Sequence, residues 1–412
     1  MPDLFLGIDL GTSGARALVI DGQGAVVSEG KSALADHGEN TRSPAIWWAA
    51  VQTALRAALS TIDPLQIKAL SVDGTSGTML AIDAQGVPLG DGVMYNDACT
   101  DADLLGRITA VSPETTAARG ASSALARAVQ LTSLRPAQVI HQADWIAGQF
   151  SGIWISDENN ALKTGYDPVA GAWPAWVGEI IDVDLLPKVV APGTPVGQVG
   201  ANEFGLAPHC VVVAGTTDGC ASFLATGASE AGDGVTALGT TLTIKLLSDA
   251  PIFAPAFGIY SHKVLGLWLA GGASNTGGNV ILSAFPGVDL DRLSAQIDPE
   301  TDTGLTYYPL SKPGERFPIN DPTLAPVLGP RPALDSDHLK AIFEGIAGIE
   351  ALAYSRLAEL GAPALRSVRT VGGGAGNAKW SRIRERHLKV PMQGPLSGEA
   401  AYGTALLARA GA

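Results

Sequence analysis

The chain has 412 residues, which is long enough for two or three domains with substantial cores. Apolar residues make up 46% of it and charged residues only 16%, below the roughly 25% that is usual in soluble domains. The net charge is −13 and no segment gathers Lys and Arg, so the composition argues against a nucleic-acid partner and against an anionic membrane surface.

Cysteine usage and the apolar runs predict a cytoplasmic protein. Cys99, Cys210 and Cys220 are odd in number, widely spaced and without a Cys-x-x-Cys pair, as reduced packing residues would be. Asp3 and Asp9 interrupt the N-terminal apolar run, so we expect no signal peptide there. No apolar stretch approaches the roughly 20 residues of a membrane helix, and the six histidines are scattered without the spacing of a zinc site.

A strand, a glycine turn and a second strand are predicted over residues 6–21. Gly11 lets the backbone turn sharply and approach a ligand. Backbone N–H groups in such a turn, with the hydroxyls of Thr12 and Ser13, can surround an anion. Asp9 stands where the first strand ends, and an anion-binding turn beside a carboxylate suits a phosphate with its metal ion. An ordinary β-hairpin turn would use the same residues.

A second segment, 238–249, repeats this layout at the same spacing. Leu10-Gly11-Thr12 recurs as Leu238-Gly239-Thr240, and an aspartate closes each segment, Asp21 and Asp249 respectively. Two hairpins of one design, far apart in the chain, predict two related domains that face each other across a nucleotide.

Strands and helices alternate around the two hairpins, as in α/β domains. The first half is predicted to hold strands at 24–30, 67–73 and 209–215, a strand at 79–83 that pairs with the one before it, and a helix that begins at Ser43-Pro44. The second half is predicted to hold strands at 264–270 and 366–371, helices from 279, from 337 and from about 398 to 410, and an irregular segment over 286–335. We place the domains at 1–224 and 225–412, and the last helix, about 398–412, could pack back on the first domain.

Asp218 is the best candidate for a general base. It follows the apolar strand 209–215 and lies among small residues that leave its carboxylate accessible. A carboxylate at a strand end can accept the proton of a sugar hydroxyl as that oxygen attacks phosphorus. Asp218 would also make a good N-cap for a helix that begins at Gly219, and the two roles can coexist.

Two familiar phosphate-binding patterns fail. The nearest Walker-type candidate, Gly30-Lys31-Ser32, has Ala25 where the first glycine is required. Gly372-Gly373-Gly374 follows a strand and precedes a helix, but Asn377 takes the place of the last glycine of a dinucleotide fingerprint. The triplet could still carry a base or ribose against its backbone, or simply form the tight turn at a helix start.

With these pieces in order, the sequence resembles the FGGY family of carbohydrate kinases over essentially its whole length. The resemblance implies two ribonuclease-H-like domains of the actin and hexokinase type, flanking a nucleotide cleft, with ATP and Mg²⁺ as cofactors and transfer of the γ-phosphate to a sugar hydroxyl. It rests on four motifs: Asp9-Leu10-Gly11-Thr12-Ser13, Gly215-Thr216-Thr217-Asp218-Gly219, Leu238-Gly239-Thr240-Thr241 and Gly372-Gly373-Gly374-Ala375.

Carried over by these motifs, the resemblance implies Asp218 as the general base and Asp9 as the carboxylate near Mg²⁺. The residues that would contact the phosphates of ATP are Gly11, Thr12, Ser13, Gly239, Thr240 and Thr241. The residues that would border the adenosine are Gly373, Gly374, Asn377 and Trp380, and those that would face the sugar are Asp73, Thr75, Ser76, Asn96 and Asp97.

The sequence departs from the family pattern at two places. Xylulose kinases typically carry Ser-Gly-Gln-Met-His-Gly where this chain has Asp73-Gly74-Thr75-Ser76-Gly77-Thr78, which looks more like ribulose kinases. The family's Asn-Asp-x-Arg has Cys99 in place of arginine, and the chain is shorter than typical members. We therefore expect an ATP-dependent ketopentose kinase, for D-ribulose first, acting as a monomer or homodimer. The alternatives are a D-xylulose kinase and an actin-type ATPase or sugar sensor without phosphotransfer.

Overall fold

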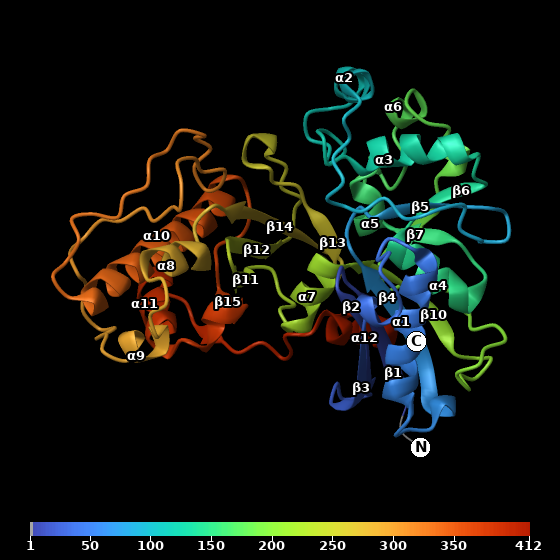
Figure 1. Ribbon diagram of the computed structural model, residues 1–412, viewed down its shortest axis with the longest axis horizontal. Helices are drawn as coiled ribbons and strands as arrows, with labels where there is room; N and C mark the ends of the chain where they lie inside the picture. Colours follow the sequence, from blue (N-terminus) through green and yellow to red (C-terminus); the bar gives the residue numbers. More distant parts are fainter. Residues whose placement is uncertain (1–2) are drawn as a thin grey trace. The chain divides into compact units, whose positions relative to one another are not determined.

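The computed structural model describes residues 3–412, and they divide into two compact units (Figure 1). The first unit comprises the chain up to residue 225 together with 262–264 and 399–412. The second comprises 226–261 and 265–398. The break at 225/226 lies one residue from the predicted boundary, and the C-terminal helix is part of the first unit.

A six-stranded sheet forms the centre of the first unit, in the order β3-β2-β1-β4-β10-β9. Strands β1, β4 and β10 run parallel, whereas β2, β3 and β9 are antiparallel to their neighbours. The bounds are β1 Leu4–Leu10, β2 Gly14–Asp21, β3 Val26–Ala33, β4 Ile67–Gly74, β9 Pro195–Gln198 and β10 Val211–Thr217.

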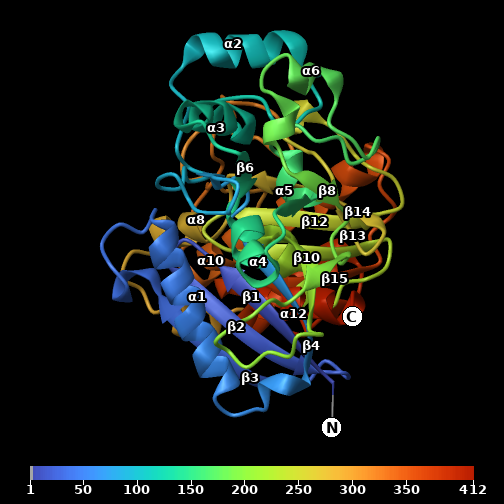
Figure 2. The same cartoon turned by 90° about the vertical axis from the view of Figure 1, so that its right-hand side faces the viewer.

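Different helices cover the two faces of this sheet, because successive side chains of a strand point to opposite sides. Leu4, Leu6, Ile8 and Leu10 of β1 pack in one core with α1, which lies along β2 and β3 (Figure 2). Phe5, between them, packs in another core with α12. The helices of the two faces are α1 (Pro44–Leu59) and α4 (Gln142–Ser151) on one side, and α7 (Asp218–Ala225) and α12 (Ala400–Ala410) on the other.

Helix α12 approaches its neighbours so closely that two glycines are required. A Cβ on Gly7 of β1 would lie 2.0 Å from the carbonyl oxygen of Ala401. A Cβ on Gly403 of α12 would lie 2.0 Å from the carbonyl oxygen of Ala221 in α7. Real atoms cannot come that near, so α12 is held in place by backbone contacts on two sides.

We expect Gly403→Ala to destabilise the protein by about 1–3 kcal/mol, because the added methyl group overpacks the crossing of α12 and α7. Gly106→Ala is the matched control, since Gly106 also lies in a helix, α2, but a Cβ there meets no atom within 4 Å. Its stability should stay equal or rise by up to about 1 kcal/mol through helix propensity alone. Thermal and urea unfolding of both variants measure the difference, and equal behaviour would contradict the tight crossing.

A smaller part of the first unit is inserted between β4 and β10. This inserted part has a hydrophobic core of its own. The insertion is therefore substantial, although the chain is shorter than typical members of the family that it resembles. The prediction that the strand after β4 pairs with it is wrong: β5 pairs with β6 in a separate two-stranded sheet. Its elements are β5 Met79–Ile82, α2 Ala102–Val111, α3 Ala124–Leu131, β6 Gln138–His141, β7 Ile155–Asp157, α5 Glu158–Leu162, α6 Ala175–Gly178 and β8 Lys188–Val190.

The second unit repeats the topology of the first. Strand β11 pairs antiparallel with β12 and parallel with β15, and β12 pairs antiparallel with β14. The order β14-β12-β11-β15 therefore repeats β3-β2-β1-β4 in both sequence and direction. This confirms that the two hairpins belong to related folds. The bounds are β11 Asp233–Leu238, β12 Leu242–Ser248, β14 Leu267–Ser274, β15 Ser367–Val371 and β16 Met392–Gln393.

The long helix α10 is the centre of the core of the second unit (Figure 1). It begins at Asp335, two residues before the predicted start, and packs on α11 and β12. Strand β14 begins three residues later than predicted, because Leu265 and Gly266 both adopt left-handed φ and turn the chain first. The helices are α8 Gly278–Ala284, α9 Leu290–Ser294, α10 Asp335–Glu359 and α11 Ala378–Leu388, and β13 (His262–Val264) belongs to the first unit.

Candidate active site

Three carboxylates gather at one edge of the first sheet. Strands β1, β4 and β10 are parallel, so their carboxyl ends meet at the same edge. Asp9 lies opposite Asp73, which lies opposite Thr216, and Asp218 follows directly as the first residue of α7. The charge of Asp218 helps to raise the pKa of both other aspartates. The fold thus brings together Asp9 and Asp218, two predicted site residues that are more than 200 positions apart in the sequence.

Asp9 is a buried carboxylate with one cationic neighbour. It is 5% exposed, and its Oδ2 lies 3.2 Å from the guanidinium of Arg16 on β2. Burial raises the pKa of Asp9, while contacts with Asp73 and Arg16 lower it. Arg16 also pairs with Glu399 at 3.1 Å, immediately before α12. The β1–β2 hairpin is thereby tied to the helix that covers this face.

Asp73 does not face a ligand, which corrects the role predicted for it. Its side chain is fully buried and accepts a hydrogen bond from the hydroxyl of Thr404 on α12. Burial raises the pKa of Asp73 well above its ordinary value, and the charge of Asp9 adds to this. A protonated Asp73 can donate to the neighbouring carboxylate of Asp9. Asp73 therefore supports Asp9 from within the core.

Asp218 begins α7 and is more exposed than the other two carboxylates. Its Oδ1 accepts a hydrogen bond of 2.7 Å from the backbone N–H of Gly219. The strand that leads to it is pressed against β4, because a Cβ on Gly215 would lie 1.7 Å from the carbonyl oxygen of Val72. Asp218 thus bonds to the first turn of the helix and stays partly accessible.

The loop predicted to face the sugar is only partly open. Thr75 is buried, and its N–H and hydroxyl both donate to Oε1 of Gln142, at 3.1 and 2.8 Å. Thr75 also pairs with Thr78 at 2.6 Å. This threonine therefore shapes the loop from inside, which corrects its predicted contact with the sugar. Ser76 is half-buried at the tip of the same loop.

Two arginines from elsewhere in the chain contact the segment 94–97, which lies just before Cys99. Asp97 pairs through both oxygens with the guanidinium of Arg42, one contact measuring 2.7 Å, and Arg42 lowers the pKa of Asp97. Arg127 is buried in α3 and donates to the carbonyl oxygens of Met94 and Tyr95.

Sequence reasoning missed both arginines. A signal existed for Arg127, because it is the lone charged residue in the apolar helix α3. Asn96, beside Asp97, is exposed, as a ligand-facing residue should be.

The inserted part of the first unit also contains a buried network of polar side chains. His141 Nδ1 is 2.9 Å from Asp144, and its Nε2 is 2.9 Å from the hydroxyl of Thr164. Asp157 caps α5 by accepting from the N–H groups of Asn159 and Asn160, at 2.8 and 3.1 Å. Burial, and then the charge of Asp144, raise the pKa of Asp157 from 3.8 to about 7.

This pKa makes the stability of the protein depend on pH. Since Asp157 has a higher pKa in the folded than in the unfolded state, the folded state binds more protons between pH 3.8 and about 7. The contribution of Asp157 is therefore present at low pH and is lost as the pH rises through 7. We expect Asp157→Asn, which keeps an oxygen to cap α5, to gain stability relative to wild type from pH 5 to about 8.

Chemical unfolding of both proteins across this range measures the effect. A difference that stays constant with pH would contradict it. Asp101→Asn is the control, because Asp101 caps α2 in the same way, by accepting from the N–H of Leu104, but is exposed.

In the second unit, two predicted glycine turns lie against each other. A Cβ on Gly372 would lie 2.7 Å from the carbonyl oxygen of Leu238, beside the turn that holds Gly239, Thr240 and Thr241. Gly373, Gly374 and their neighbours form a short helical turn before α11. The fold therefore brings the predicted phosphate turn and the predicted adenosine turn together. Thr240 and Gly373 are exposed.

Sequence reasoning missed a third glycine turn at the same place. A Cβ on Gly277 would lie 2.7 Å from Cα of Thr241, and the N–H of Gly278 donates to the carbonyl oxygen of Gly239 at 2.9 Å. The signal was present, since a glycine pair lies between β14 and the body of α8, with Gly278 as the first residue of that helix.

Asn377 and Trp380 have structural roles. Asn377 caps α11 by accepting from the N–H of Trp380 at 2.9 Å, and its side chain pairs with Ser294. Trp380 is 3% exposed and stacks on Phe343 with ring centroids 4.6 Å apart. Its ring is part of the core and has no free face for adenosine, which corrects the predicted contact.

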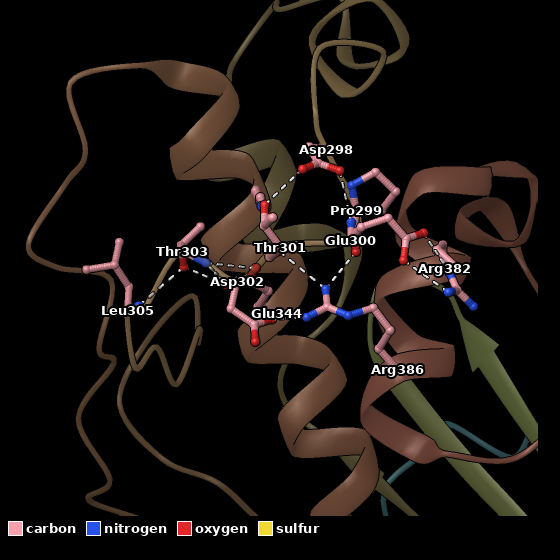
Figure 3. A network of polar contacts seen from close by, with 11 residues as sticks. Asp298, Pro299, Glu300, Thr301, Asp302, Thr303, Leu305, Glu344, Arg382 and Arg386 are labelled. Carbon is pink, nitrogen blue, oxygen red and sulfur yellow. Dashed lines mark hydrogen bonds and ion pairs between the residues drawn. The ribbon is translucent and has the colours of Figure 1, made fainter.

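The segment 298–305 fastens α11 to α10 (Figure 3). Arg382 of α11 pairs with Glu300 at 2.8 Å, and Arg386 donates to the carbonyl oxygen of Pro299 at 2.6 Å. On the other side, Glu344 of α10 accepts from both the N–H and the hydroxyl of Thr303. These contacts fix α11 and hence the glycine turn that precedes it.

Comparison with known proteins decides the family. A family model described as the FGGY family of carbohydrate kinases, N-terminal domain, matches residues 4–105, and the C-terminal domain model matches 234–412. The chain belongs to the FGGY family of carbohydrate kinases. It is accordingly a sugar kinase, and the two-domain actin- and hexokinase-type fold predicted from its motifs is confirmed. Membership implies ATP as the phosphoryl donor.

Relatives of this FGGY kinase span most of its length. The chain is 27% identical to a xylulose kinase of Streptomyces coelicolor, over 96% of the chain and 85% of that protein. It is 21% identical to the solved xylulose kinase of Bifidobacterium adolescentis, with a TM-score of 0.82, covering 100% of the chain and 93% of that protein. The gluconate kinase of Lactobacillus acidophilus gives a TM-score of 0.81 at 17% identity, over 99% and 89%. The fold alone therefore does not separate these sugars.

The carboxylates of the first unit fit a Mg²⁺ ion. Mg²⁺ prefers oxygen ligands and binds one or two carboxylates together with waters and substrate phosphates. Among residues 3–412, no group of three His, Cys, Asp or Glu side chains could hold a metal ion. Across the same residues, no helix is long and apolar enough to span a bilayer.

Proposed function

We propose that this FGGY kinase transfers the γ-phosphate of ATP to a hydroxyl of D-xylulose. The choice of D-xylulose as the substrate rests on one observation: a relative named xylulose kinase matches 96% of the chain. The preference for D-ribulose drawn from the loop at 73–78 loses its main support, since Asp73 and Thr75 of that loop point into the core. Of the other residues predicted to face the sugar, Asn96 is exposed, Asp97 is paired with Arg42, and the hydroxyl of Ser76 is buried.

Asp218 is the base in this proposal. The residue is partly accessible, at the edge of the sheet where Asp9 and Asp73 also lie. It accepts the proton of the attacking hydroxyl, and that oxygen then forms its bond to the γ-phosphorus while the bond to the β-phosphate oxygen breaks. Asp9 would hold Mg²⁺, which when bound would neutralise phosphate charge.

The glycine turns hold the phosphates of ATP in this proposal. Thr12 and Ser13 are exposed on the turn of the first hairpin, and Thr240 is exposed on the turn of the second. Backbone N–H groups and hydroxyls are neutral donors, so they bind phosphate oxygens without needing to titrate. Positioning and electrostatics of this kind supply most of the rate in phosphoryl transfer.

We expect Asp218→Asn to lower kcat by about 10²–10⁴, because the amide cannot take up the proton of the sugar hydroxyl. The amide oxygen still accepts from the N–H of Gly219, so α7 should begin as before. ATP affinity, measured by calorimetry, should stay within about twofold, since the base does not bind the nucleotide. Asp101→Asn, which changes another helix-capping aspartate, is expected to keep full activity.

Unchanged turnover of Asp218→Asn with the sugar would overturn the assignment of the base. So would a loss of the same size in Asp101→Asn, since that residue caps a helix of the inserted part.

Kinetics with a panel of ketopentoses test which sugar the kinase prefers. D-xylulose and D-ribulose differ in the orientation of one hydroxyl, and a buried polar group left without its partner costs about 1–3 kcal/mol. We expect kcat/KM for D-xylulose to exceed that for D-ribulose by about 10-fold or more. Product analysis with ATP identifies the phosphorylated sugar.

Faster phosphorylation of D-ribulose would reverse the specificity and restore the interpretation of the loop at 73–78. Release of ADP with no sugar phosphate from any ketopentose would instead support an ATPase or sensor.

A further inference from the structure

Asn159, in the first turn of α5, uses its whole carboxamide to join three segments of the first unit. It is 1% exposed. Its Nδ2 donates to the hydroxyl of Thr216 on β10 and to the carbonyl oxygen of Lys263 on β13, both at 2.9 Å. Its Oδ1 accepts from the N–H of Lys263 at 2.8 Å. Both N–H groups and the oxygen are thereby used, and a fully paired buried amide fixes its neighbours in one geometry.

The bond to Thr216 acts two residues before Asp218. The register of β10 on β4 shifts between Val213 and Thr216, so the ladder is irregular just where the strand approaches its end. Gly215 is pressed against the backbone of Val72 within this irregular stretch. An interrupted ladder fixes a strand end less firmly than a continuous one. The side-chain bond from Asn159 therefore anchors the end of β10 from a second direction.

The bonds to Lys263 attach a segment that is distant in sequence. Strand β13 follows 36 residues of the second unit, 226–261, yet it belongs to the first. Its backbone pairs with Asn159 through two hydrogen bonds, and its Lys263 side chain lies 3.5 Å from Glu158. β13 also packs on α7, which begins with Asp218. One amide thus fixes both the strand before Asp218 and a strand that packs on the helix after it.

We propose that Asn159 is a positioning residue for phosphoryl transfer, holding the β10–α7 corner so that the carboxylate of Asp218 stays aimed at the sugar hydroxyl. This inference rests on the proposed role of Asp218. Displacing a catalytic group by about 1 Å can cost on the order of 10²-fold in rate, although substrate binding is left intact. The defect should therefore appear in kcat and not in KM.

Paired substitutions at Thr216 test the bond itself. Thr216→Val keeps the shape of the side chain but removes the acceptor, and we expect kcat to fall about 10- to 100-fold with both KM values within about twofold. Thr216→Ser restores the hydroxyl and should recover kcat to within about threefold. Asn159→Leu keeps a similar volume but removes both the donor and the acceptor of the amide, and should lower kcat at least as far as Thr216→Val.

Thr164→Val is the matched control. Thr164 is a fully buried threonine just after α5, and its hydroxyl bonds to His141 at 2.9 Å. Losing this bond should lower the thermal midpoint about as much as Thr216→Val does, but leave kcat unchanged. A merely structural role for Asn159 would give both valine variants the same kinetics.

The kinetic results distinguish a failure of this proposal from a failure of the proposed function. Wild-type kcat in folded Thr216→Val or in folded Asn159→Leu overturns the proposal, as does an equal loss of kcat in Thr164→Val. A wild-type protein that phosphorylates no sugar, or an Asp218→Asn variant with full turnover, refutes the proposed function instead. Circular dichroism and thermal melts identify a variant that fails to fold, and the other of the two variants then carries the test.

Discussion

The parallel alignment of β1, β4 and β10, with α12 pressed on one face, is the constraint on which the first unit depends. Parallel strands bring their carboxyl ends to one edge, and the alternation of side chains places Asp9 and Asp73 on the face that α12 covers. Gly7 and Gly403 allow that helix to approach within backbone contact. Any larger residue would lift the helix that closes the core beneath the acidic edge.

The three aspartates at this edge differ in environment, and the difference separates their roles. Asp73 is fully buried and bonded to Thr404, Asp9 is nearly buried beside Arg16, and Asp218 is partly accessible at a helix start. Burial disfavours a charged carboxylate, so the innermost aspartate has its pKa raised most clearly. One edge of the sheet therefore holds both an inner carboxyl group with a raised pKa and an outer one that is partly accessible.

The second unit has the same strand order as the first, but different residues at the turn of its hairpin. Its β11–β12 hairpin has no aspartate at the position of Asp9, and glycines surround its turn instead. Gly277 and Gly372 each approach the turn so closely that a Cβ would clash with backbone. The segment 298–305 and the core stacking of Trp380 on Phe343 hold α11 behind it. This gives a turn that is held on several sides, with Thr240 exposed on it.

The sequence by itself determined the two related hairpins, the alternation of strands and helices, and the motifs that identify the family, because these depend on local pattern and spacing. Tertiary structure alone decided which site residues face outward. Asp73, Thr75 and Trp380 stand in the right motifs, but their exposure depends on Thr404, Gln142 and Phe343, which lie 331, 67 and 37 positions away. Arg42 was missed for the same reason. A hydrogen bond or a stacked ring between distant segments leaves no periodic signal in a single sequence, so only the folded chain reveals which polar groups it uses for itself.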